Sequence, residues 1–180
     1  ADRFLSKEPD HADLWLIKGI ALYKTGHHSE ATSALDEALI KNPLLADAWF
    51  YKGLSSAALS HNAEAIAAFD KAIEINPSHA QAFFHRGTAR AVLRAYREAV
   101  ADFDQALMSD PENPAILFRK GAACIHIHRY EDALDALNRV LHALPGDAHA
   151  LYLKGMTLTR LGRHAEAIDS FEEAIAKNPD

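Results

Sequence analysis

Apolar residues recur along the chain at helical spacing, in segments that end at glycine or proline. The segment ADLWLIKGIALYK has no internal proline, and its apolar positions predict an amphipathic helix. Thr25-Gly26-His27 interrupts it, and a glycine there suits the positive φ of a helix end. A second helical segment, SEATSALDEALIKN, follows, with Ser29 as the candidate N-cap and Pro43 as its stop. The pattern therefore predicts two helices joined by a short turn.

This pair of helices repeats every 34 residues. Glycines follow that period at Gly19, Gly53, Gly87, Gly121 and Gly155, and prolines follow it at Pro9, Pro43, Pro77, Pro111, Pro145 and Pro179. A fixed period of this length is typical of a stacked array of helical hairpins rather than a closed globule. We therefore expect five units, at residues 12–45, 46–79, 80–113, 114–147 and 148–180, with residues 1–11 as the end of a truncated preceding unit.

Small and large residues also keep the period within the second helix. Alanine occupies one position throughout, at Ala31, Ala65, Ala99, Ala133 and Ala167, and a large apolar residue occupies another, at Leu35, Phe69, Phe103, Leu137 and Phe171. Large side chains that fill the space left by small ones let neighbouring helices pack densely. The sequence thus predicts close helix–helix contacts in every unit.

The pattern over residues 12–180 resembles the tetratricopeptide repeat, in its aromatic, glycine, alanine, aromatic, alanine and proline positions. Trp15, Trp49 and Phe83 stand at the first aromatic position, which Leu117 and Leu151 take later. The resemblance implies an all-α fold, a right-handed superhelical solenoid of helix-turn-helix hairpins. It also implies a scaffold for protein–protein interaction that binds a partner peptide or segment in a concave groove.

One feature departs from the family pattern, because a basic residue precedes each repeating glycine. These residues are Lys18, Lys52, Arg86, Lys120 and Lys154, and an acidic or amide residue recurs at Asp36, Asp70, Asp104, Asn138 and Glu172. Each of the first four acidic or amide residues precedes the next unit's basic residue by 16 positions. Two interpretations are open: an ion pair at each junction between units, or a basic stem lying on apolar surface with its charge in water.

In the resembled family the first helix of each unit lines the groove. The corresponding residues here are Leu16, Ile20, Phe50, Tyr51, Leu54, Phe84, His85, Phe118, Arg119, Tyr152 and Met156. The aromatic members are candidate anchors for a ligand, and the alternative is that they pack against neighbouring units. His85 and Arg119, with His149, Arg160 and His126 near them, are candidates to hold a peptide carboxylate; the alternative is an ordinary solvated wall.

The best-known specific site of the family is a clamp for the acidic C-terminus of chaperones. At its five positions this chain has Phe50, Leu54, His85, Ala115 and Arg119, of which only Arg119 matches, with His85 as a stand-in. We therefore expect no standard chaperone clamp.

Composition narrows the classes of function further. The net charge of −6 argues against a nucleic-acid partner, which needs a basic surface for phosphates. No apolar run approaches the ~20 residues of a membrane span. The single cysteine, Cys124, fits a cytoplasmic protein and occupies a packing position. The paired histidines lack the spacing of metal ligands, and no catalytic motif occurs, so we expect no enzyme, cofactor or metal.

Two alternatives to groove binding remain at this stage. The apolar residues Ile168, Phe171 and Ile175 of the last unit predict an open face, which favours self-association through the terminal repeats into a structural scaffold. The chain is also compatible with a regulatory repeat segment of a larger multidomain protein.

Overall fold

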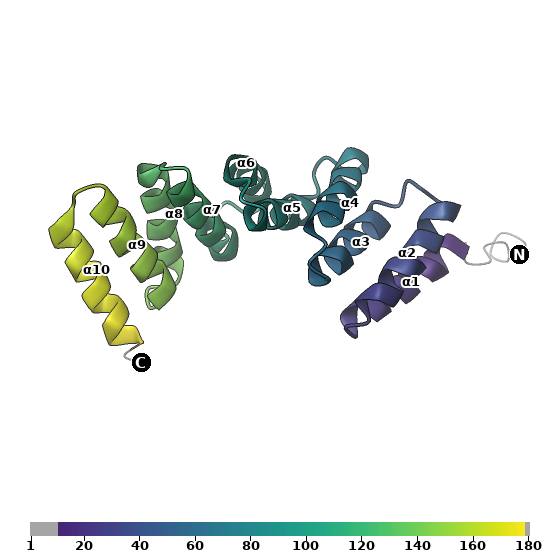
Figure 1. Ribbon diagram of the computed structural model, residues 1–180, viewed down its shortest axis with the longest axis horizontal. Helices are drawn as coiled ribbons and strands as arrows, with labels where there is room; N and C mark the ends of the chain where they lie inside the picture. Colours follow the sequence, from purple (N-terminus) through teal and green to yellow (C-terminus); the bar gives the residue numbers. More distant parts are fainter. Residues whose placement is uncertain (1–10, 179–180) are drawn as a thin grey trace, which may run out of the picture. The chain divides into compact units, whose positions relative to one another are not determined.

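The computed structural model describes residues 11–178, and every regular element in that range is an α-helix (Figure 1). The helices are α1 (His11–Lys24), α2 (His28–Lys41), α3 (Ala46–Ala58), α4 (Asn62–Ile75), α5 (Ala80–Val92), α6 (Tyr96–Leu107), α7 (Pro114–His126), α8 (Tyr130–Ala143), α9 (Ala148–Arg160) and α10 (His164–Lys177). Short turns join them in pairs. All but residue 11 of the predicted stub at residues 1–11 lies outside the described residues.

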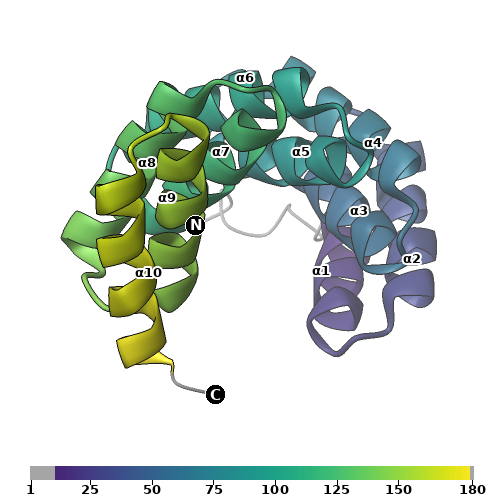
Figure 2. The same cartoon turned by 60° about the vertical axis from the view of Figure 1, so that its left-hand side comes forward.

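The helices form two compact units, residues 1–89 and 90–180 as far as they are described, and the boundary falls inside α5. In the first unit α1 packs on α2 and α3 on α4, while α3 also contacts α2 and α1. In the second unit α7 packs on α8 and α9 on α10; α6 contacts α7, α8 contacts α9, and α7 contacts α9 (Figure 2). Within each unit the first helices of successive hairpins therefore touch each other.

The repeating glycines are required by the close approach of the two helices in a hairpin. A Cβ atom at Gly53 would lie 2.6 Å from the ring of Phe69, and one at Gly155 would lie 2.6 Å from the ring of Phe171. Carbon atoms in contact prefer separations of about 3.5–4.0 Å, so any side chain there would push the helices apart. The predicted dense packing of large residues against small ones is confirmed at these hairpins.

The turn inside each hairpin places one residue in the left-handed region of φ. Gly26 and Gly162 take φ values of 82° and 76°, and the same position is occupied by Ser60, Arg94 and His128, with φ values of 64°, 62° and 60°. Glycine has no Cβ and adopts this conformation without the steric cost that other residues meet. Three hairpins thus carry local backbone strain at their turns.

The predicted N-cap of α2 is wrong by two residues. The helix begins at His28, with His27 at the cap and no side-chain hydrogen bond there. Ser29 lies inside the first turn, where its carbonyl oxygen accepts hydrogen bonds from the hydroxyls of Thr32 (2.8 Å) and Ser33 (3.2 Å). The helix start follows the turn at Gly26 rather than the nearest hydroxyl side chain.

A buried ion pair lies between α5 and α6. The Arg90 Nη1 atom is 2.8 Å from Asp102 Oδ2, and the Asp102 side chain is only 3% exposed. The corresponding pairs of positions in the other hairpins hold no charge: Leu22 with Ala34, Ser56 with Ala68, Cys124 with Ala136, and Leu158 with Ser170. A buried charge is costly unless it is paired, and the contact with Arg90 contributes to that pairing.

Candidate functional site

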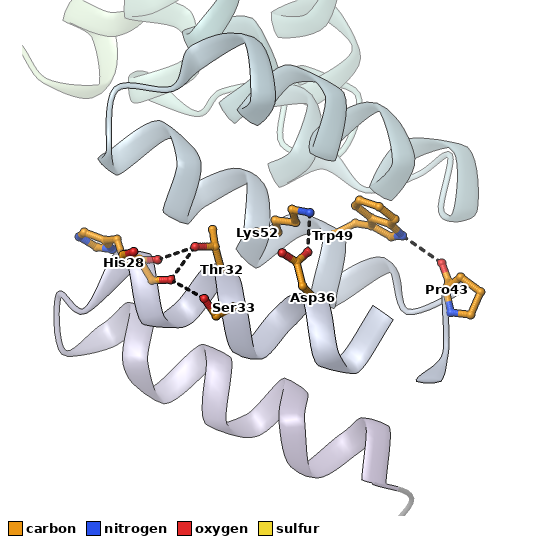
Figure 3. Close-up of polar contacts among 8 residues, drawn as sticks. His28, Thr32, Ser33, Asp36, Pro43, Trp49 and Lys52 are labelled. Carbon is orange, nitrogen blue, oxygen red and sulfur yellow. Dashed lines mark hydrogen bonds and ion pairs between the residues drawn. The ribbon is translucent and has the colours of Figure 1, made fainter. Parts of the chain in front are cut away.

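Ion pairs join successive hairpins at the positions that the sequence pattern singled out. Lys52 Nζ lies 2.5 Å from Asp36 Oδ1 (Figure 3), Arg86 Nη1 lies 2.5 Å from Asp70 Oδ1, and Lys120 Nζ lies 2.7 Å from Asp104 Oδ1. The predicted ion pairs are thus confirmed at three junctions. At the fourth junction Asn138 replaces the aspartate, so Lys154 meets no carboxylate at that position.

Two of these basic residues, Lys52 and Arg86, also cover an aromatic ring one turn earlier in their own helix. Lys52 Nζ is 5.3 Å from the centre of the Trp49 ring, and the guanidinium carbon of Arg86 is 5.2 Å from the centre of the Phe83 ring. Each cation therefore interacts with a carboxylate and with an aromatic face. The Trp49 indole is fixed as well, because its Nε1–H donates to the carbonyl oxygen of Pro43 at 2.9 Å (Figure 3).

The predicted groove residues of the first unit differ in accessibility. Phe50 and Leu54 are buried, at 8% and 9% exposure, in a core cluster with Phe69. The other five are half-buried: Leu16, Ile20, Tyr51, Phe84 and His85. Phe50 thus holds α3 in place instead of offering its ring to a ligand.

Aromatic and imidazole rings pack around Phe50 in this unit. The His79 ring lies 4.7 Å and the His85 ring 5.8 Å from the Phe50 ring, measured between centroids. His79 precedes α5, and its Nδ1 accepts a hydrogen bond from the backbone N–H of Ala82 at 3.3 Å. Burial lowers the pKa of His79, and the nearby Asp47 carboxylate opposes this shift. The neutral imidazole therefore serves as an acceptor at the start of α5.

The predicted groove residues of the second unit are more accessible. Arg119 is exposed on α7 and Tyr152 is 52% exposed on α9, while Phe118 and Met156 are half-buried. The Tyr152 ring lies 6.0 Å from the Phe171 ring of α10, between centroids, at an interplanar angle of 54°. This unit therefore presents both aromatic and cationic side chains from its first helices.

A pocket of about 390 Å³ opens beside these residues in the second unit. Its walls come from the first half of α7, the end of α8 and the start of α9: Pro114, Ala115, Phe118, Arg119, Val140, Leu144, Asp147 and His149. Pockets that hold small ligands have volumes of about 300–1,000 Å³ and are mostly apolar, with a few polar groups. The pocket brings together three residues that the sequence singled out, Phe118, Arg119 and His149.

The polar side chains of the pocket are Asp147, Arg119 and His149, and they differ in their contacts. Asp147 Oδ1 accepts the backbone N–H of Ala150 at 2.8 Å, so this carboxylate caps the start of α9. Arg119 and His149 are exposed and lie at the pocket wall. A guanidinium can hold a carboxylate through two parallel hydrogen bonds. The arrangement can therefore receive an apolar side chain with an acidic group beside it.

Sequence reasoning missed Val140 and Leu144, the pocket walls at the end of α8. They belong to the second helix of their hairpin, whereas the family resemblance directs attention to first helices. Leu144 is 47% exposed. The ring of His126 stacks on that of Tyr96, with centroids 4.1 Å apart, and His126 is not a wall of the pocket. In the sequence, the position of Leu144 directly before the Pro145-Gly146 turn is the feature that could have indicated this wall of the pocket.

Neither metal binding nor thiol chemistry is supported by the residues that the structure describes. No group of three or more metal-binding side chains occurs among them. Cys124 is buried at 0% exposure and unpaired, and burial raises the pKa of its thiol. A raised pKa lowers the thiolate fraction, so Cys124 serves packing, as predicted. No described helix is long and apolar enough to cross a membrane.

Comparison with models of known protein families shows to which family the chain belongs. A sequence model of the tetratricopeptide repeat matches the chain in five overlapping stretches, at residues 1–38, 18–80, 57–114, 84–148 and 127–180. The chain belongs to the tetratricopeptide repeat family. A search of curated protein sequences found no significant match.

Solved structures of other tetratricopeptide repeat proteins share the fold. A MamA double mutant superposes with a TM-score of 0.89 at 18% identity, over 96% of this chain and 97% of the other. MamA from Desulfovibrio magneticus RS-1, from its residue 41 to the end, also gives 0.89 at 18% identity, over 96% and 98%. YrrB, described as a protein with an unusual peptide-binding site, gives 0.88 at 22% identity, over 92% and 86%. The fold is thus an all-α solenoid of tetratricopeptide hairpins.

Proposed function

We propose that this protein is an interaction scaffold that binds a peptide segment of a partner protein, and that the pocket between α7, α8 and α9 is the anchor of that site. The pocket carries the proposal, because it joins apolar walls to Arg119 and His149 on the helix face that the sequence pattern predicted. The peptide-binding site in the description of YrrB, which shares the fold, supports the same class of function.

The chemistry of the pocket defines the peptide that we expect. Phe118, Val140 and Leu144 offer apolar surface for one aliphatic or aromatic side chain. Arg119 binds an acidic group next to it, either an Asp or Glu side chain or a terminal carboxylate. The protein's net charge of −6 repels acidic segments elsewhere, so the local cation at Arg119 gives this site its selectivity.

A defined peptide panel tests this function. Labelled peptides of about ten residues would combine an aliphatic or aromatic residue with an adjacent Asp, or with Asn as the neutral match, and each would carry a free or an amidated C-terminus. We expect fluorescence anisotropy to show binding only for peptides that have both the apolar residue and a negative group. Arg119→Ala should weaken that binding by about ten- to a hundredfold, as expected for a charge-assisted hydrogen-bonded contact.

Arg97→Ala is the matched control. Arg97 is an exposed arginine of α6 and is not a wall of the pocket, so its loss removes the same charge without touching the site. The pocket assignment fails if both variants weaken binding equally, because binding would then depend on general charge. It also fails if no member of the panel binds.

The cellular location that we propose is the cytoplasm. The only cysteine is buried and unpaired, which suits a reducing compartment. We propose no nucleic-acid partner, since the acidic balance of the chain opposes binding to phosphates.

A further inference from the structure

A face of α1 exposes two apolar residues, one of them at a position that is covered elsewhere in the array. Leu14 is 48% exposed, whereas its counterparts Ala48, Ala82 and Ala150 are all 0% exposed. Ile17, on the same helix, is 62% exposed. In the later hairpins the second helix of the preceding hairpin packs at this place, as α2 does on α3 and α8 on α9. The exposed face of α1 thus has the composition of a covered junction.

A complementary face lies on α10. Ile168 and Ile175 are 57% and 64% exposed. Their counterparts in the second unit are more buried, because the first helix of the next hairpin packs on the same helix. Leu134, the counterpart of Ile168, is 6% exposed, and the counterparts of Ile175 are Leu107, at 8%, and Leu141, which is half-buried. The face of α10 therefore has the residues that a following first helix would cover.

Charges on the two faces match as well. Lys18 of α1 stands at the position of Lys52 and Lys120, and its Nζ lies 4.6 Å from the centre of the Trp15 ring. Glu172 of α10 stands at the position of Asp36 and Asp104. Neither Lys18 nor Glu172 forms an ion pair within the part of the chain that the structure describes. The three observed junctions all pair these two positions.

We propose that α10 of one copy packs against α1 of a second copy, and that Glu172 and Lys18 form the ion pair of this junction. The contact repeats the geometry of the junctions inside each unit, with apolar side chains buried around one pair of opposite charges. It is heterologous, because two different faces meet, so each copy can bind one neighbour at each face. This proposal uses neither the pocket nor Arg119, and its failure would leave the peptide site untouched.

Sedimentation velocity over a wide range of protein concentration tests the contact. We expect the average mass of the wild type to rise with concentration. Ile175→Glu should weaken association at least about tenfold, because it replaces a buried apolar side chain with a charge. Ile40→Glu is the matched control, since Ile40 is 75% exposed on α2 and belongs to neither face. Far-ultraviolet circular dichroism would check that both variants keep their helices.

A charge exchange tests the register of the two faces. Lys18→Glu alone and Glu172→Lys alone should each weaken association about tenfold, because each places like charges at the junction. An equal mixture of these two variants should associate again, since every contact between unlike copies then pairs opposite charges. A wild type that stays monomeric at all concentrations would overturn the proposal and leave the α1 face to residues 1–10 or to another partner. Association as strong in Lys18→Glu alone as in the wild type would overturn it too.

Discussion

Each hairpin turn has one residue with a positive φ, a conformation that favours glycine, and three of the five turns have another residue there. Gly26 and Gly162 suit this conformation, whereas Arg94 takes it with a φ of 62°. The period requires one such residue in every turn, yet the sequence supplies glycine in only two of the five. The strain at the other three is a local cost that the surrounding hairpins tolerate.

Relief of that strain gives a prediction. We expect Arg94→Gly to raise the free energy of unfolding by about 0.5–1 kcal/mol, because glycine removes the Cβ clash and its added freedom in the unfolded chain offsets part of the gain. Gly162→Ala should lower it by a similar amount. Urea unfolding followed by circular dichroism measures both. A loss of stability in Arg94→Gly would show that its side chain contributes more than the strain costs.

His79 is a second residue with a measurable consequence. Its folded pKa is lowered from 6.5 by burial, so the unfolded chain binds more protons below that value. The stability that His79 contributes is therefore fully present above about pH 6.5 and is lost as the pH falls through the folded pKa. Protonation also removes the Nδ1 acceptor from the Ala82 N–H.

We expect His79→Asn to weaken this pH dependence, because an amide oxygen accepts the same hydrogen bond without titrating. Asn113 provides the precedent, since its Oδ1 accepts from the N–H of Ala115 at 3.1 Å at the start of α7. Thermal midpoints at about pH 7.5 and about pH 5.5 should differ less in the variant than in the wild type. Equal differences in both proteins would remove His79 as the cause.

At the scale of elements, junction ion pairs fix how one hairpin sits on the next. We expect Lys52→Met to lower the free energy of unfolding by no more than about 1 kcal/mol at low salt, and by less at high salt, because the pair is partly exposed. Lys154→Met is the matched control, since Asn138 stands 16 residues before Lys154, where Asp36 stands before Lys52. A thermal midpoint that does not change at either salt concentration in Lys52→Met would show that the Asp36 contact contributes nothing.

The buried pair between α5 and α6 should behave differently. Arg90→Leu removes the cation that lies 2.8 Å from the buried Asp102 carboxylate, and should lower the free energy of unfolding by up to about 3–5 kcal/mol. Combining it with Asp102→Ala recreates the Leu22 and Ala34 combination of the first hairpin, so we expect the double variant to be at least as stable as the wild type. Chemical unfolding of the three proteins measures this. A double variant as unstable as Arg90→Leu would contradict the comparison.

The limits of sequence reasoning are clearest among these elements. The period located the hairpins, the glycine contacts and the three ion pairs, because each depends on residues that recur at fixed spacing. The Arg90–Asp102 pair was missed because it occurs once and breaks the period. Phe50 was expected at a ligand surface and lies at 8% exposure, because the ring of His79 and its neighbours cover it. Coverage by neighbouring side chains cannot be read from a repeat position.

At the scale of the whole molecule, the second unit combines two proposed surfaces of different chemistry. The pocket joins apolar walls to Arg119, whereas the α10 face joins Ile168 and Ile175 to Glu172. A peptide in the pocket and a second copy on α10 would contact different residues. The two activities are therefore separable by single substitutions, Arg119→Ala for one and Ile175→Glu for the other.

The most direct measurement of the peptide site is chemical-shift mapping by NMR with the tightest-binding peptide of the defined panel. We expect the largest amide shifts at Ala115, Phe118 and Arg119 of α7, at Leu144 after α8, and at His149 of α9, the residues that surround the pocket. Shifts concentrated on α10 or α1, with the pocket residues unchanged, would contradict the proposed function and place peptide binding on the apolar faces instead.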